Sequence, residues 1–425
     1  MTEHHHRKSL PADRQAPVWM LDGWSRPSLL IGAFGIVVLL LLALLGPRAS
    51  GNYPGTVNYI MRGWLSGFVL WTGASLGCMA FLMVSHLSAG KWGLAVRRIL
   101  EAGSRGFPLM FILGLPVLFY AHTLYPWTPQ NIGSLGEEAR QVVLHKQHQL
   151  LNLPFFYVRY VLYFAIWSAF SFTLSRWSIQ RDEDPARRDW MRIFENLSGI
   201  GLVVYALTMT FAVVDWVMSL DATWYSTIYG LIYLAGQGLT ALSISIITVL
   251  LLGREEPVRT VLRKTELHDL GKLMLAFTML YAYLSFSQWL IIWSGNLAEE
   301  IPWYLNRMNG GWKYLAQFLI LFEFAVPFAL LLSRTLKRRP GFMVPLCMFV
   351  ICIRAVDLWW MIEPNFPNAQ GHFHFYVGSL AYVVGPVAIG AIWIWRFLNQ
   401  LRRYPIVPAY DPQLSEILEP EHAAV

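Results

Sequence analysis

Charged residues are scarce in this chain. Asp, Glu, Lys and Arg make up 14% of its 425 residues, and 56% of the residues are hydrophobic. An ordinary globular domain carries about 25% charged residues, so the composition excludes that class. The formal net charge of +7 would suggest a nucleic-acid partner in a soluble protein. Here the basic residues gather between long apolar runs, so we expect a multi-pass membrane protein with no nucleic-acid partner.

Cysteine is also rare, and the ligand pairs of metal sites are missing. Cys78, Cys347 and Cys352 all lie in apolar runs, and no CxxC motif is present. A disulfide framework, a zinc site and a cysteine-ligated iron–sulfur cluster therefore lack ligands. No two histidines are expected at matching depth on neighbouring helices, as a b-type haem requires. We expect this chain to bind no metal and no redox cofactor of its own.

Long apolar runs make up most of the sequence. A membrane span needs about 20 apolar residues, and only helices satisfy their backbone groups within each such run. Runs of this kind lie at 29–46, 64–87, 104–123, 152–175, 197–220, 225–252, 270–294, 312–333, 341–362 and 373–398. The sequence therefore predicts an all-α integral membrane protein with ten transmembrane helices.

The basic residues indicate the orientation of the chain. Most of the 33 Lys and Arg residues lie in the N-terminal tail and in alternate connections, around Arg97, Arg187 and Arg263 and at 334–339. Such connections face the cytoplasm in membrane proteins. We therefore expect both termini to be cytoplasmic.

A repeat relates the two halves of the chain. Asp215 and Asp221 end the fifth run, and Asp357 and Glu363 end the ninth run with the same spacing. The tripeptide LSR closes both the fourth and the eighth run. An even number of helices per unit makes such a repeat parallel. We expect two four-helix bundles, spans 2–5 and 6–9, with the first and tenth spans peripheral. The expected units are a cytoplasmic tail (1–27), the first span with an outer loop (28–63), the two bundles (64–222 and 223–363), the tenth span (364–398) and a second cytoplasmic tail (399–425).

Several titratable residues fall at membrane depth, where a charge costs a few kcal/mol or more and is a functional candidate by default. Arg354 and Asp357 are three residues apart on one helix and can pair directly. Glu323, near the middle of the eighth run, has no obvious partner. The candidates for a proton route are Glu323, Asp215, Asp357, Arg354, Arg159, Asp221, Glu363, His86 and His122, and those for its inner mouth are His268, Asp269 and Lys272.

Two other interpretations of these residues stay open. The same charges could be ion pairs that lock helices together, because some proteins retain buried pairs for specificity. Alternatively, Asp215, Asp221, Arg159 and His122 could form a quinone pocket in the outer half of the membrane.

Four segments of the sequence carry a family resemblance: LNLPFFYVR (151–159), DWVMSLDATWYSTIYG (215–230), LHDLGKLMLAFTMLYAYLSFSQWLIIWSGNLAEEIPWY (267–304) and RYPIVPAYDP (403–412). With these, the chain from about residue 60 onward resembles the F-type membrane subunit of bacterial alternative complex III, in the NrfD/polysulfide-reductase membrane-subunit family. The family has two four-helix bundles, as the repeat also predicts. HKQHQLLN (145–152) departs from the Lys-x-x-Tyr-Leu-Asn expected there, so no role is carried over to His145, Lys146 or His148.

The resemblance implies a subunit of a respiratory quinol:cytochrome c oxidoreductase in the bacterial cytoplasmic (inner) membrane. Its partners would be a homologous C-type membrane subunit, an iron–sulfur subunit and multihaem cytochrome subunits, together with lipids, the quinol pool and a terminal oxidase. Haem c and iron–sulfur clusters would lie in those partners. The resemblance supports a polar route at Asp215, Asp221, Glu323, Arg354 and Asp357.

The sequence thus predicts a non-redox membrane subunit that provides a transmembrane proton route beside the quinol-oxidising subunit. A chain that itself binds and oxidises quinol is the first alternative. A structural membrane scaffold is the second. A secondary transporter is the third, and the absence of obvious broken helices argues against it.

Overall fold

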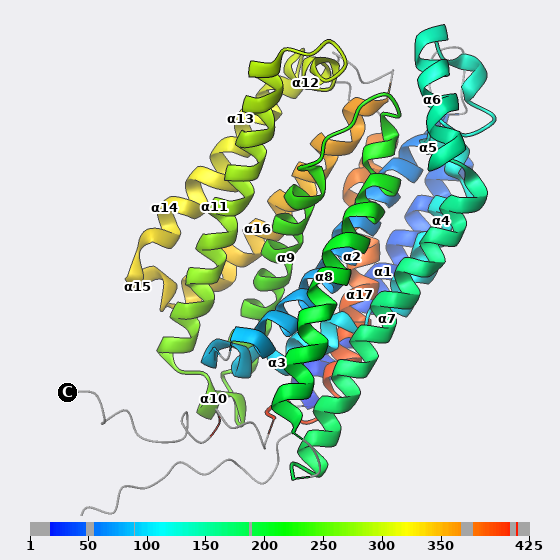
Figure 1. The fold of residues 1–425 in the computed structure, drawn as a ribbon. Helices are drawn as coiled ribbons and strands as arrows, with labels where there is room; N and C mark the ends of the chain where they lie inside the picture. The colour runs from blue at the N-terminus through cyan, green and yellow to red at the C-terminus, as the bar shows by residue number, and fades with distance from the viewer. Residues whose placement is uncertain are drawn as a thin grey trace, which may run out of the picture.

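The computed structural model describes residues 18–47, 55–88, 90–186, 189–366, 377–408 and 414. The predicted tails at 1–27 and 399–425 therefore lie largely outside the described residues. Within the described part the chain is helical and has no strand, as Figure 1 shows. The all-α prediction is confirmed.

Nine helical segments of the described chain are long and apolar enough to cross a membrane. They are α1 (Val18–Leu45), α2 (Thr56–Ser88), α7 (Leu153–Glu183), α8 (Trp190–Trp216), α9 (Tyr229–Leu252), α11 (Lys264–Gly295), the segment Trp312–Leu332, α16 (Pro340–Ile362) and α17 (Ala381–Leu401). A bent pair, α3 (Lys91–Ser104) and α4 (Phe107–Phe119), would make ten if it counts as one span. These helices indicate a multi-pass membrane protein.

The third span differs from the predicted run at 104–123. Its helix begins at Lys91 and bends by 41° between α3 and α4. Gly106 lies at the bend and Pro108 follows in the first turn of α4, where its missing N–H breaks no helix hydrogen bond. Sequence reasoning placed the charged stretch of α3 in a loop, but α3 is a mostly buried helix that contacts α2, α7, α9 and α17.

The eighth span is also irregular. It consists of α13 (Trp312–Leu319), a π-helical turn, η3 (Ile320–Ala325), and α14 (Val326–Leu332). Pro327 opens α14 and cannot donate a backbone hydrogen bond, which favours a local change of helix geometry. The eighth span nevertheless remains one continuous span. The expectation of no broken helices is wrong because of the bend between α3 and α4, so it no longer argues against a transporter.

Helix α2 occupies the middle of the structure and contacts α3, α4, α8, α9, α16 and α17. Glycines allow two of these contacts: a Cβ at Gly63 would meet the Ala381 carbonyl oxygen at 2.3 Å, and one at Gly77 would meet the Gln237 carbonyl oxygen at 2.3 Å. Small residues permit such close approach of membrane helices. Helix α17 lies between α2 and α1, as the ribbon shows (Figure 1).

We call α2, α4, α7 and α8 the first helix group, and α9, α11, the eighth span and α16 the second helix group. In the first group α2 contacts α4 and α8, α4 contacts α7, and α7 contacts α8. In the second group α9 contacts α11 and α16, α11 contacts α14, and α13 contacts α16. The groups meet mainly where α2 and α8 pack on α9.

Glu363 links three elements at one end of the molecule. Arg62 of α2 donates to its Oε1 at 2.9 Å, and the Tyr382 hydroxyl of α17 donates to its other oxygen. The guanidinium of Arg62 also lies 3.7 Å from the ring centre of Phe366. Glu363, predicted as a proton-route residue, is thus buried in an ion pair that joins α2, α16 and α17.

Replacing Arg62 by Met should destabilise the protein strongly. The Glu363 carboxylate would stay buried without its cation, which typically costs about 3–5 kcal/mol. Thermal unfolding of the purified full-length protein in detergent measures this loss. The double variant R62M/E363Q removes both charges and should recover most of the stability. Equal losses in the single and double variants would contradict the ion-pair interpretation.

Candidate functional site

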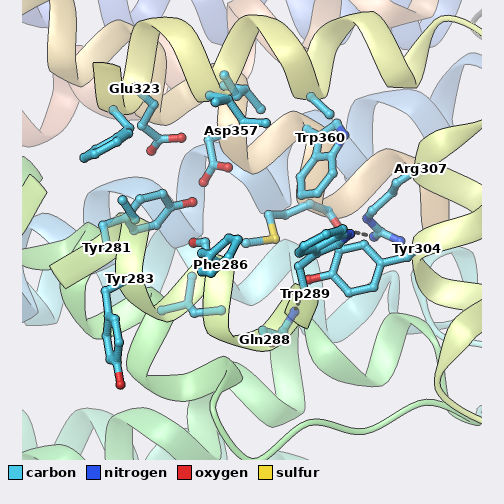
Figure 2. A pocket seen from close by; sticks show the side chains of 18 of the residues that line it. Tyr281, Tyr283, Phe286, Gln288, Trp289, Tyr304, Arg307, Glu323, Asp357 and Trp360 are labelled. Carbon is cyan, nitrogen blue, oxygen red and sulfur yellow. Dashed lines mark hydrogen bonds between the residues drawn. The ribbon is translucent and has the colours of Figure 1, made fainter. Parts of the chain in front are cut away.

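The second helix group borders a cavity of about 690 Å³ that opens to the outside of the helices, shown in Figure 2. Residues from α9, α11, the eighth span, α16 and the short helix α12 (Ile301–Met308) line it. Most of its wall is apolar or aromatic, including Phe286, Trp289 and Trp360. Its volume lies within the range of roughly 300–1,000 Å³ typical of small-molecule sites.

Polar side chains occur at two ends of this cavity. Glu323 and Asp357 lie near one end, and Tyr304 and Arg307 lie near the other, with the aromatic walls between them (Figure 2). The cavity therefore joins a carboxylate end to a donor-rich end through an apolar passage.

The carboxylate end is organised by one arginine. Nη1 of Arg354 donates to Glu323 Oε1 at 2.5 Å and to Asp357 Oδ2 at 2.8 Å. Glu323 comes from η3, whereas Arg354 and Asp357 come from α16. We call these three residues the Glu323 cluster. The predicted pairing of Arg354 with Asp357 is confirmed. The expectation that Glu323 lacks a partner is wrong, because its partner comes from another helix.

A glycine makes room for this arginine. A Cβ on Gly236 of α9 would lie 2.1 Å from Nη2 of Arg354, closer than any real contact. On its other side the guanidinium lies 4.5 Å from the ring centre of Tyr281, a cation–π distance. Gly236 and Tyr281 thus hold the guanidinium in place. Sequence reasoning missed both residues.

The other end of the cavity contains neutral donors and a buried cation. Gln288 donates to the Tyr304 hydroxyl at 3.2 Å and accepts from Ser226 at 3.0 Å. Arg307 donates to the carbonyl oxygens of Trp303 at 2.9 Å and Met361 at 2.7 Å. Burial lowers the pKa of Arg307 to about 10 and raises that of Tyr304 to about 12, so both keep their protons at neutral pH. Apart from the family-like segment IPWY, no sequence pattern indicated these roles.

The Asp215 carboxylate, in the first helix group, is fully hydrogen-bonded. Arg159 donates to both of its carboxylate oxygens, at 2.7 and 2.6 Å, and the Tyr163 hydroxyl donates at 2.8 Å. A third guanidinium nitrogen of Arg159 binds the Leu150 carbonyl oxygen at 2.9 Å. Both carboxylate oxygens are occupied, so the structure favours the ion-pair interpretation for Asp215 and Arg159.

The four residues predicted to form a quinone pocket do not line one cavity. Asp221 lines a cavity of about 180 Å³, to which Asp215, Arg159 and His122 do not contribute. Oδ1 of Asp221 accepts from the backbone and hydroxyl of Thr223, which closes a turn. His122 has an exposed side chain.

A lysine forms part of the wall beside Asp221. Nζ of Lys146 donates to the Ala222 carbonyl oxygen at 2.7 Å. Burial lowers the pKa of Lys146, and the nearby Asp221 carboxylate partly opposes this. The departure from the family pattern at 145–152 thus still leaves Lys146 in contact with the segment after α8.

The remaining candidates lie apart from the Glu323 cluster. Nδ1 of His86 hydrogen-bonds the Ser198 hydroxyl of α8 at 3.1 Å. Asp269 and Lys272 form an exposed ion pair on α11 at 2.9 Å, next to His268. The structure therefore divides the predicted route into separate sites, and only the Glu323 cluster borders the large cavity.

Gly236→Ala should disrupt the Glu323 cluster without removing any charge. The new methyl group occupies the position of the guanidinium, so Arg354 must leave or the helices must separate, at a cost of about 1–3 kcal/mol. Gly199→Ala on α8 is the matched control, because its Cβ would meet open space. Thermal unfolding in detergent compares the two. A G236A protein as stable as G199A would contradict this packing.

The sequence matches no protein-family model, and no curated protein matches it either. The family resemblance of the four segments therefore stays an expectation. The function is therefore inferred mainly from the geometry of the site.

Proposed function

We propose that this chain is a membrane subunit of a respiratory quinol:cytochrome c oxidoreductase of the alternative complex III type, in a bacterial inner membrane. In that assembly it provides a transmembrane proton route beside the quinol-oxidising subunit. The observation that carries the proposal is the Glu323 cluster, in which two buried carboxylates share one guanidinium beside a cavity. The resemblance of the four segments supplies the type of complex and its partners.

The charge of the cluster suits it to holding a proton. With both carboxylates ionised, Glu323, Asp357 and Arg354 carry one negative charge in excess. An uncompensated charge is costly in a low-dielectric interior, and one bound proton neutralises it. Both carboxylates contact the same Nη1, so the proton can reside on either without moving the arginine. Waters in the cavity could deliver it, because both acids line the wall.

The helix contacts support the two-bundle repeat as part of this proposal. In each helix group an ion pair joins the third helix to the fourth. Asp215 on α8 binds Arg159 on α7, whereas Arg354 on α16, which also binds Asp357, binds Glu323 on the eighth span. The first contact has one acid per arginine and the second has two. We therefore assign proton transfer to the second bundle and a structural role to the contact in the first.

A second candidate function is quinol binding by this chain. The cavity favours it, because its aromatic walls could enclose a ring, its tyrosine and glutamine end could donate to quinone oxygens, and Asp357 could accept a proton at the other end. Electrons would then pass to a partner subunit, because the sequence has no CxxC motif and no histidine pair expected at matching depth for a redox centre. This cavity lies in the second bundle, whereas the residues of the predicted quinone pocket lie in the first.

Neutral replacements test the proton route. In Glu323→Gln and Asp357→Asn the excess negative charge is removed, so proton release per electron should fall while quinol oxidation continues. The assembly is purified through the full-length chain and reconstituted in vesicles, and external acidification is measured against cytochrome c reduction. Asp269→Asn, in the exposed pair, should change neither quantity. Unchanged proton release in both cluster variants would overturn the proposal.

Filling the cavity separates the two functions. Ala316→Trp places a large ring in the cavity wall, so quinol oxidation should drop about tenfold or more if a ring binds there. Phe318→Trp, on an exposed part of the same helix and outside the lining, is the control. Normal quinol oxidation in the A316W assembly would exclude this cavity as the oxidation site.

A further inference from the structure

Helices α3 and α7 meet along a buried polar seam. It joins three residues of α3 to four residues of α7, namely Arg98, Glu101, Ser104, Ser171, Ser175, Ser178 and Asp182. Side-chain contacts hold both of its ends: Arg98 binds Asp182 at one, and the Ser171 hydroxyl donates to the Ser104 hydroxyl at 2.8 Å at the other. The α3–α7 seam shares no residue with the Glu323 cluster.

The α7 side of the seam forms one continuous face of a helix. Ser171, Ser175, Ser178 and Asp182 are spaced by four, three and four residues, which places them in one row. The three serines have exposed fractions of 0–1%. The row is about 16 Å long at 1.5 Å per residue. Ser171 and Ser175 lie at the end of the apolar run 152–175, and Ser178 and Asp182 lie beyond it. The row begins on the side that the basic residues predict to be cytoplasmic.

Four buried atoms of this seam have no hydrogen-bond partner among the described residues. They are Oγ of Ser175, Oγ of Ser178, Oε1 of Glu101 and Oδ1 of Asp182. The two carboxylate oxygens can only accept, so a hydroxyl or water must donate to them. Buried polar groups left unpaired are rare and are commonly satisfied by ordered water.

Buried hydroxyls without a partner also occur in other described membrane helices, at Ser66, Thr72, Ser243, Ser245 and Ser285, but only the seam adds two carboxylate oxygens without a partner. Many hydroxyls of the other helices are bonded within their own helix. There, threonine hydroxyls donate to the carbonyl oxygen four residues earlier, as at Thr208, Thr210, Thr240, Thr248 and Thr278. That arrangement is the usual one for hydroxyl residues in membrane helices. Ser175 and Ser178 lack this bond. Their hydroxyls are therefore free to bind something else in the seam.

We propose that the α3–α7 seam holds a chain of buried waters, which forms a solvent inlet from the predicted cytoplasmic side. The waters bridge the orphan oxygens of Glu101 and Asp182 to the hydroxyls of Ser178 and Ser175. Ser175 is the last residue of the apolar run at 152–175, so the inlet lies at the predicted cytoplasmic end of this span.

Arginines offset the negative charge of Glu101 and Asp182 at the mouth of the inlet. Arg98 binds both Glu101 and Asp182 directly. Arg97 and Arg181 lie close enough to interact electrostatically with the same two acids. The arginines offset the negative charge of the two acids, whose oxygens accept hydrogen bonds from the waters.

Trp167 closes the inlet at its inner end. It is the next residue of the same α7 row beyond Ser171, it is fully buried, and its Nε1 donates to the Thr208 hydroxyl at 2.9 Å. Its ring packs on Phe164 and Trp216, with ring centres 5.3 and 6.0 Å away. The wet segment therefore ends below the ion pair of Asp215 with Arg159.

Cysteine substitution with silver ions as a water-sized probe tests the inlet. Ser175→Cys and Ser178→Cys are made in the full-length chain in inside-out membrane vesicles. Cys352→Ala removes the exposed native thiol, and the reaction of this background is subtracted. Both thiols should react at least about tenfold faster than those of two controls, because only hydrated thiols ionise readily. The controls are Phe172→Cys, on the exposed face of α7, and Phe164→Cys, buried beyond Trp167.

Two outcomes would overturn the proposal. The first is that the thiols at 175 and 178 react with silver ions no faster than the thiols of the two control variants. The second, which needs no substitution, is a density map of the unaltered protein that resolves waters elsewhere but none within hydrogen-bond distance of Ser175 or Ser178. This second measurement decides the question if a cysteine variant fails to fold. Loss of the proton route at the Glu323 cluster would leave both outcomes unaffected, so the two proposals fail separately.

Discussion

The cost of an unpaired charge away from water governs the interior of this protein. The buried carboxylates at Asp215 and Glu363 each bind an arginine and a tyrosine, which together occupy both carboxylate oxygens. In two other places, two carboxylates share one arginine: Glu323 and Asp357 at Arg354, and Glu101 and Asp182 at Arg98. The saturated contacts join helices. The shared contacts adjoin either a cavity or buried atoms that need water. The shared contacts also join helices, and we propose them as the candidates for proton and water traffic because of what they adjoin.

Sequence reasoning succeeded where interactions are local and failed where they join distant helices. Apolar runs of spanning length predicted the helices, because the membrane leaves the backbone no alternative. The pair Arg354–Asp357 was predictable from its spacing of three residues. Glu323 is 31 residues from Arg354, and Arg62 is 301 residues from Glu363, so no local pattern marks either contact. Helix α3 was missed for another reason: its charges resemble those of a loop, and only the tertiary packing against α2 and α7 buries them.

In the repeat that we propose, Asp215 and Asp357 occupy matching positions but have different surroundings. Asp215 receives two bonds from Arg159 and one from Tyr163, which leaves neither carboxylate oxygen free. Asp357 shares Arg354 with Glu323, and it borders a cavity. A carboxylate beside open space can exchange a proton with water there, whereas a fully bonded one has no oxygen left to accept another hydrogen bond. A change in the number of partners of the acid in one copy would turn a structural ion pair into a proton-exchange site.

The Glu323 cluster also goes against the default packing of its helices. A π-helical turn carries Glu323, and such turns are rare and frequent at functional sites. Gly236 lacks the side chain that a well-packed helix contact would use, and that space is taken by the guanidinium of Arg354. A regular eighth span and an alanine at 236 would give better helix geometry and closer apolar packing, but they would remove the space for one arginine to reach two acids. The π-helical turn and Gly236 both depart from regular helix packing to allow this one contact. Such departures are expected where a site is selected for chemistry instead of stability.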